Sequence, residues 1–153
     1  MLELRGNYDI FSLPQNGEAM CVTTNGIVKA DGHAVMGAGI AKQANELFHL
    51  SGILGKYLVQ YGNRAFNLGR FKRNNDAIFT VFSLPTKHDW KNDSDINLIV
   101  KSCEQLVEMC DKFNITKCYL TPPGCANGHL NYESTVKPWI SQILDDRFIV
   151  VIR

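Results

Sequence analysis

The segment VTTNGIVKADGHAVMGAGIAKQA, residues 22–44, changes character twice within one connection. It begins as a short apolar strand that ends at Asn25, and it continues through a polar loop that contains glycine. Residues 36–41, MGAGIA, then open a pattern with helical spacing. Small residues before a helix let backbone N–H groups approach a phosphate at the positive helix end. They also suit a plain tight turn, so both interpretations stay open at this point.

Strand and helix signals alternate along the whole chain. Strands are expected within residues 2–11, 18–25, 66–71, 77–85, 117–123 and 147–153, and helices within residues 39–50, 94–113 and 131–144. Residues 51–62 either extend the first helix or start another one. Ser94 is the expected N-cap of its helix, and Pro138 predicts a kink or a later start in the last helix. The alternation predicts an α/β fold with helices on both sides of a mixed sheet.

The composition is that of one globular domain. The chain has 153 residues, a net charge of +1 and an apolar fraction of 45%, so no global field favours nucleic acid. Five scattered cysteines without C-x-x-C spacing indicate free thiols in a reducing compartment, and no zinc-site spacing is present. Neither a signal sequence nor a membrane-spanning run is recognisable. We expect a cytoplasmic protein, with a nuclear location left open, and take a monomer as the default.

Three loops follow the ends of expected strands, where open α/β sheets bind their ligands. The first is residues 25–39, described above. Another is TPPGCANGHLNY, residues 121–132, where small residues alternate with larger ones directly after a strand. Successive N–H groups in such a loop can form an anion-binding nest, or the loop simply needs positive φ angles at Asn127 and Gly128. Two glycine-rich loops at strand ends favour a diphosphate more than either does alone.

The remaining loop, LPTKHDWKNDSD, spans residues 84–95. Lys87 directly follows a strand, so its amine could act as a nucleophile or as a fixed cation. His88 and Asp89 are adjacent acid–base candidates, although the same residues are typical of a solvated loop. The basic run RFKRNND, residues 70–76, could contact nucleic acid but is typical of a solvated hairpin turn. Cys125 is interpreted as a small packed residue, since no His/Asp arrangement accompanies it.

These motifs together resemble those of macro domains, the ADP-ribose-binding α/β/α modules. Asn25 falls on the second asparagine of the family's N-A-A-N pattern, and residues 36–41 fall on its small-residue stretch. GNYDIF, residues 6–11, resembles the opening G-D-[IL]-F pattern, and residues 121–133 resemble the second phosphate loop. The resemblance covers nearly the whole chain. It implies a single macro domain over residues 1–153, with three α/β/α layers around a mixed central sheet.

The resemblance also implies a ligand, ADP-ribose, with no cofactor and no metal. Asp9 would accept a hydrogen bond from the adenine amine, Ile10 would offer a backbone N–H, and Asn25 would hold the distal ribose. The diphosphate would lie between two loops, whose implied ligand-binding residues are Met36, Gly37, Ala38, Gly39 and Ile40 on one side and Gly124, Cys125, Ala126, Asn127, Gly128 and His129 on the other.

The MGAGIA run and the Thr-Lys pair after the middle strand are most similar to one subgroup of macro domains. It contains the terminal ADP-ribose glycohydrolases acting on proteins and the antitoxins that remove ADP-ribose from DNA bases. Lys87 falls on the catalytic lysine, which either attacks the anomeric carbon or positions the ribose, and Asn25 would assist it. Gly128 stands where protein-directed members carry a catalytic aspartate. His88, Asp89 and His129 are therefore the candidates for acid–base help.

The resemblance implies an enzyme that hydrolyses an ADP-ribosyl linkage. Its partners would be ADP-ribose and ADP-ribosylated protein or DNA, and the linkage itself is left open. Two alternatives remain: a binding module that captures ADP-ribose or a related nucleotide without turnover, and a phosphatase acting on ADP-ribose 1″-phosphate. The small size of the chain, without an attached effector domain, favours the enzyme.

Overall fold

The structure is a computed structural model that describes residues 1–73 and 76–153. Part of the basic run, Asn74 and Asn75, lies outside these residues. A six-stranded sheet forms the centre, in the order β1-β6-β5-β2-β4-β3. Its strands are β1 (Leu2–Arg5), β2 (Ala19–Thr24), β3 (Phe66–Lys72), β4 (Ile78–Pro85), β5 (Cys118–Leu120) and β6 (Phe148–Ile152). All neighbouring pairs are parallel except β3 with β4, so the sheet is mixed as predicted.

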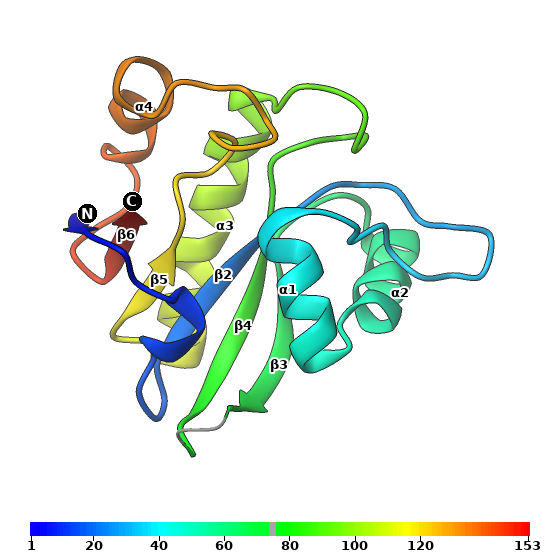
Figure 1. Ribbon diagram of the computed structural model, residues 1–153, viewed down its shortest axis with the longest axis horizontal. Coiled ribbons are helices and arrows are strands. Elements are labelled where there is room, and N and C mark those ends of the chain that lie inside the picture. Colours follow the sequence, from blue (N-terminus) through cyan, green and yellow to red (C-terminus); the bar gives the residue numbers. More distant parts are fainter. Residues whose placement is uncertain (74–75) are drawn as a thin grey trace.

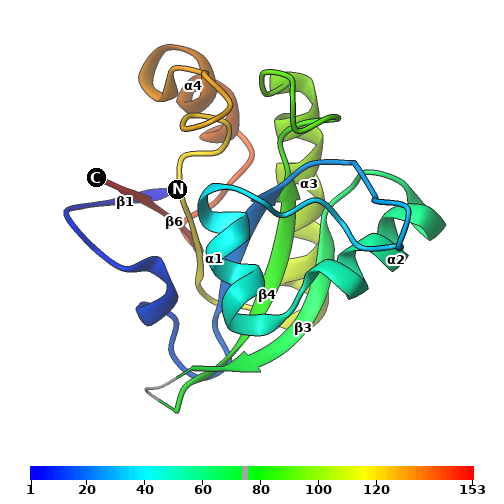
Figure 2. The same cartoon turned by 45° about the vertical axis from the view of Figure 1, so that its right-hand side comes forward.

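Helices cover both faces of this sheet (Figure 1 and Figure 2). They are α1 (Gly39–Phe48) and α2 (Ser51–Tyr61) on one face and α3 (Ile96–Phe113) and α4 (Lys137–Ile140) on the other. Neighbouring side chains of β4 point to opposite faces, as the strand period requires. Phe79 therefore packs with Phe48 of α1, whereas Phe82 belongs to the apolar cluster that contains Ile99 of α3. The predicted three-layer α/β/α fold is confirmed.

One helix start differs from the sequence expectation, and two open alternatives are resolved. Asp95, rather than Ser94, caps α3, because its side chain accepts a hydrogen bond from the Asn97 amide at 2.9 Å. The expected segment 51–62 contains a separate helix, α2, which ends at Tyr61 with Gly62 as its C-cap. The last helix starts late, since a π-helical turn, η2 (Tyr132–Val136), precedes α4. Pro138 then lies in the first turn of α4, where its missing N–H has no intrahelical partner to lose.

The cysteines are free, as predicted, and most are buried in one core layer. Cys21, Cys103, Cys110 and Cys118 are buried, and Cys125 is half-buried. Burial raises the pKa of the Cys103 thiol to about 12, so it stays protonated near neutral pH. These side chains behave as small apolar residues of the core.

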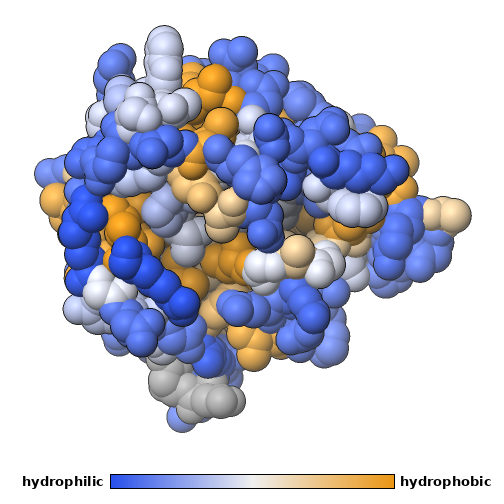
Figure 3. All heavy atoms as spheres, turned by 45° about the horizontal axis from the view of Figure 1, so that its top comes forward, coloured by the Kyte–Doolittle hydropathy of each residue, from blue (hydrophilic) through white to orange (hydrophobic). Residues whose placement is uncertain are grey.

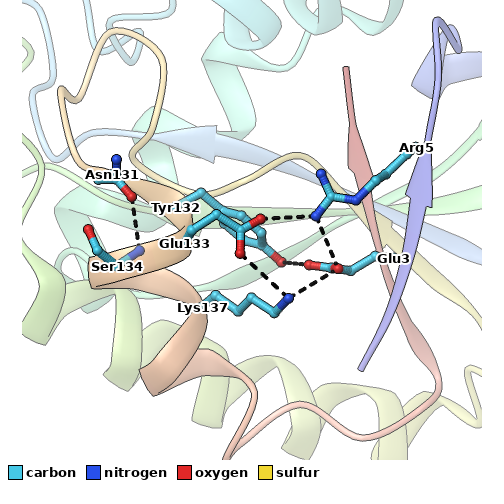
Figure 4. A network of polar contacts seen from close by, with 7 residues as sticks. All are labelled: Glu3, Arg5, Asn131, Tyr132, Glu133, Ser134 and Lys137. Atoms are coloured by element: carbon cyan, nitrogen blue, oxygen red, sulfur yellow. Dashed lines mark hydrogen bonds and ion pairs between the residues drawn. The ribbon is translucent and has the colours of Figure 1, made fainter.

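A polar network ties β1 to η2 and α4 (Figure 4). The Tyr132 hydroxyl donates to Glu3 Oε2 at 2.7 Å, and Lys137 Nζ donates to Glu3 Oε1 at 3.2 Å. Arg5 contacts both Glu3 and Glu133. The hydrogen bond from Tyr132 is the main reason that the pKa of Glu3 lies below its usual value. The network anchors the segment that follows the second glycine-rich loop.

Tyr132→Phe removes the hydroxyl that stabilises the ionised Glu3. We expect the free energy of unfolding to fall by about 1 kcal/mol near neutral pH, because one hydrogen bond to a charged group is lost while others remain. The lowered pKa of Glu3 makes this contribution present above the pKa of the unfolded state, and it is lost as the pH falls through the pKa of the folded state. Urea unfolding over a pH series measures the difference. A deficit that stays constant down to strongly acidic pH would contradict the assignment to Glu3.

Candidate ligand-binding cleft

A cleft of about 1620 Å³ opens where the carboxyl ends of β2, β4 and β5 meet, and it continues along α1 to the short helix η1 (Ile10–Ser12). Its walls include residues from all three loops that the sequence singled out. The space-filling view of this side shows hydrophobic residues in the hollowed part of the surface, with hydrophilic residues around them (Figure 3). Ligands of open α/β sheets bind at this edge of the sheet.

Asn25 closes the first loop at its base. Its Nδ2 donates to the Val35 carbonyl at 3.0 Å, and its Oδ1 accepts from the Ile27 amide at 3.0 Å. The side chain is half-buried and lines the cleft. The amide thus shapes the loop that carries residues 36–41 toward α1, a structural role that the sequence did not predict.

The first turn of α1 leaves its backbone donors open. Ala38 is the N-cap without a side-chain hydrogen bond, and Lys42 is the first residue whose amide bonds back, to the Ala38 carbonyl at 3.2 Å. Within the described chain the amides of Gly39, Ile40 and Ala41 have no acceptor, and all three residues line the cleft. Such a helix end carries a partial positive charge and binds anions.

The second glycine-rich loop offers another run of open donors. The amides of residues 126–128 have no acceptor among the residues that the structure describes. The loop is closed by the Leu130 amide, which donates to the Gly124 carbonyl at 2.9 Å. Positive φ angles occur at Gly124 (+76°) and His129 (+63°), so the prediction that placed them at Asn127 and Gly128 was wrong. Both residues lie at the ends of the loop, next to its closing hydrogen bond.

The two loops approach each other across the cleft. A side chain on Gly39 would bring a Cβ atom to 3.3 Å from Asn127 Nδ2. Gly39 itself has a φ of +57°, a conformation that favours glycine. A Cβ on Gly37 would meet no atom within 4 Å, so its side faces open space. Both sets of open amides therefore border one narrow region.

Gly128 has no room for a side chain. A Cβ atom there would overlap Ser94 Oγ and would lie 2.5 Å from the Gly124 carbonyl oxygen. Ser94 is buried, and its amide donates to the Gly128 carbonyl at 3.1 Å. A side chain at position 128, such as that of an aspartate, is therefore incompatible with this packing.

Lys87 bridges two of the loops. Its Nζ donates to the Asn127 carbonyl at 3.0 Å and to the Trp90 carbonyl at 3.4 Å. Its own carbonyl accepts from Asn63 Nδ2 at 3.0 Å, and the next carbonyl, of His88, accepts from the Gly26 amide at 3.1 Å. These contacts give the ammonium group the geometry of a fixed cation beside the second glycine-rich loop.

Three other predicted candidates separate into different environments. His88 Nε2 contacts Asp95 Oδ2 at 2.8 Å at the start of α3, which lowers the pKa of Asp95, and His88 does not line the cleft. Asp89 does not line it either, and accepts from the Lys91 amide at 3.0 Å. Cys125 lines the cleft, but burial raises the pKa of its thiol to about 11. A protonated thiol is a poor nucleophile.

The far end of the cleft holds an ion pair that the sequence did not reveal. Asp9 Oδ1 accepts from the Phe11 amide at 3.0 Å, and Asp9 Oδ2 accepts from Arg73 Nη1 at 2.8 Å. The Arg73 guanidinium also lies over the Phe11 ring, 5.8 Å from its centroid. Asp9, Ile10 and Arg73 all line the cleft. Arg73 belongs to the basic run interpreted as a solvated turn, and only the tertiary fold brings it to Asp9.

Nothing among the described residues points to a resident metal, because no three His, Cys, Asp or Glu side chains gather there in a metal-binding arrangement. The helices of the same residues all lack the length and hydropathy that spanning a bilayer requires.

Two sets of open amides at the carboxyl ends of the central strands give this three-layer α/β/α fold an arrangement that can bind an anion such as a phosphate group. More specifically, this chain has the macrodomain fold. Similar solved structures include the macrodomain of Mycobacterium tuberculosis DarG, with 23% identity, a TM-score of 0.76, and coverage of 99% of this chain and 97% of that one. The macrodomain of Thermus aquaticus DarG has 24% identity, a TM-score of 0.73, and coverage of 99% and 97%.

Thermosipho africanus DarTG in complex with ADP-ribose is also similar, with 20% identity and a TM-score of 0.77. The alignment covers 99% of this chain and 42% of that longer one. No family model and no curated protein sequence matches the chain. At these identities the likeness establishes the shared fold, and the function has to be argued from the cleft.

The tight packing around Gly128 can be tested by substitution. Gly128→Ala is expected to lower the free energy of unfolding by about 1–3 kcal/mol, because the added methyl group overlaps Ser94 and the Gly124 carbonyl. Ser94→Ala is expected to be neutral or stabilising, since its buried Oγ has no hydrogen-bond partner within the described chain. Gly37→Ala, where the methyl group meets open space, is the matched control in urea unfolding. Equal stability of the Gly128 and Gly37 variants would contradict the packing argument.

Proposed function

We propose that this protein binds ADP-ribose in the cleft and hydrolyses an ADP-ribosyl linkage on a protein or a nucleic acid. One observation carries the proposal: the open amides of α1 and of residues 126–128 border the same region, and the Lys87 ammonium group lies directly beside it. A diphosphate between the loops would receive hydrogen bonds from both sides. The low net charge of +1 is compatible with this, because backbone donors rather than a basic surface hold the phosphates.

The two ends of the cleft suit the two ends of ADP-ribose. Asp9 offers a carboxylate to the adenine amine, and Ile10 and Phe11 supply an apolar surface for the base. At the other end, Asn25 and Lys87 border the place of the distal ribose. The solved complex of Thermosipho africanus DarTG with ADP-ribose, which shares the fold, supports this ligand.

In the proposed reaction, water replaces the group attached to C1″ of the distal ribose. Positive charge develops on that ribose as the bond breaks. Lys87, held by two carbonyl groups, would position the ribose hydroxyls and would stabilise the negative charge that develops on the leaving group. The lack of room for a side chain at Gly128 favours one alternative, a binding module without turnover, because no aspartate fits at that position.

Three substrates incubated in parallel test the proposal: ADP-ribosylated protein, ADP-ribosylated single-stranded DNA and ADP-ribose 1″-phosphate. We expect release of ADP-ribose from one of the first two, detected by chromatography. Release of phosphate alone would favour the phosphatase. Calorimetric binding of ADP-ribose without any product would favour the binding module, and absence of binding would overturn the proposal.

Lys87→Ala is expected to lower kcat at least about 100-fold, because the cation that stabilises the negative charge developing on the leaving group is lost. Binding of ADP-ribose should stay within a few fold of the wild type, since the backbone amides hold the diphosphate. Turnover and calorimetric titration on the same preparation separate the two effects. Lys42→Ala is the control, because Lys42 lies on α1 but does not line the cleft. Unchanged turnover in Lys87→Ala would remove the lysine from the mechanism.

Arg73→Ala is expected to weaken ADP-ribose binding by about tenfold, because a charge-assisted hydrogen bond that orients Asp9 is lost. The effect should disappear with ribose 5-phosphate, which has no adenine. Calorimetry with both ligands measures the difference. Arg70→Ala, a neighbouring charge on β3 that does not line the cleft, is the control. An equal loss with both ligands would show that Arg73 does not act at the adenine end.

A further inference from the structure

The loops at the sugar end of the cleft, residues 86–95 and 121–131, are tied together by three contacts. Lys87 Nζ donates to the Asn127 carbonyl, and the Ser94 amide donates to the Gly128 carbonyl at 3.1 Å. The third contact joins His129 Nδ1 to Asp93 Oδ1 at 2.8 Å. This imidazole–carboxylate pair combines a titratable side chain of one loop with an orienting carboxylate of the other, and His129 lines the cleft.

We propose that His129 is the general acid of the reaction, oriented by its contact with Asp93. The inference rests on the proposed hydrolysis. It assigns a catalytic role to His129, which would touch the leaving group, and a positioning role to Asp93, which acts through His129.

The hydrogen bond to Asp93 determines which ring nitrogen of His129 is available to a ligand. With Nδ1–H donating to the carboxylate, Nε2 is the nitrogen left for chemistry, and it has no partner within the described residues. Nε2 donates a proton when the ring is protonated and accepts one when it is neutral. A carboxylate that fixes the tautomer and the ring orientation is the usual companion of an acid–base histidine.

The backbone of this loop sets where the His129 side chain leaves the chain. His129 has a φ of +63°, an uncommon conformation for a residue with a side chain. Backbone strain of this kind is found mainly at functional sites. Its amide donates to the Ala126 carbonyl at 3.3 Å, and the next amide, of Leu130, closes the loop on Gly124. The segment that offers open amides to a diphosphate therefore also places the imidazole at the cleft wall.

The proposed step balances with water as the second reactant. The bond between C1″ and the leaving atom breaks, and its electron pair stays on the leaving atom. That atom takes the proton from Nε2 of His129, which becomes neutral. Water forms the new bond to C1″ and loses one proton, and the imidazole regains one, so the net reaction consumes one water molecule.

Leaving-group dependence tests the assignment. Each protein is assayed with the natural linkage that the wild type cleaves and with ADP-ribose joined through C1″ to 4-nitrophenol, an anion that departs without protonation. His129→Gln is expected to lose about 100-fold in kcat on the natural linkage and less than about threefold on the nitrophenyl compound. Asp93→Asn is expected to lose about tenfold on the natural linkage alone, because the tautomer and orientation of the ring are less well fixed.

His88→Gln is the matched control. His88 makes the same kind of contact, Nε2 to Asp95 at 2.8 Å, but does not line the cleft, so wild-type rates are expected on both substrates. ADP-ribose affinity, measured by calorimetry, should stay within a few fold for all three variants.

The outcomes are distinguishable. A wild-type protein that releases ADP-ribose from no substrate overturns the proposed function, and the inference falls with it. An active wild type with an unaffected His129→Gln variant overturns the inference alone. An equal loss on both substrates also overturns it, because a structural role of the ring does not depend on the leaving group.

Discussion

The parallel pairing of β2 with β4 is the constraint on which the rest of the site depends. The register pairs Thr24 with Pro85, and the ladder continues past both strand ends through the Thr86 amide, which donates to the Thr24 carbonyl at 3.0 Å. The Gly26 amide continues it to the His88 carbonyl. Because both strands run the same way, their loops leave from one edge, and this ladder sets Asn25 beside Lys87.

Unsatisfied polar groups concentrate around this edge. Two buried side-chain atoms of the described chain lack a hydrogen-bond partner, Asn63 Oδ1 and Ser94 Oγ. Asn63 supports the Lys87 carbonyl, and Ser94 packs under Gly128. The open amides of the two glycine-rich loops add to the same region. Proteins tolerate such local costs mainly at functional sites, and here a bound anion would satisfy the amides.

The sequence predicts those elements of the fold that local residue patterns determine. β-branched and aromatic runs predicted β4, and helical spacing predicted α1 and α3. The glycine-rich loops could be recognised because glycine allows backbone conformations and close approaches that other residues do not. The pairs Asp9–Arg73 and Asp93–His129 were not found, since their members are 64 and 36 positions apart in the chain. Only the sheet order brings such residues together. The cap of α3 was misplaced by one residue because Ser94 and Asp95 are both good caps.

Gly128 shows how packing restricts where an acid can be placed in this fold. The loop must pass close to Ser94 for its closing hydrogen bonds to form, and this leaves no volume for a Cβ atom at position 128. The next residue, His129, has a positive φ, lines the cleft and contacts Asp93. The absence of a side chain at position 128 and the presence of an oriented imidazole at position 129 therefore follow from the same backbone path.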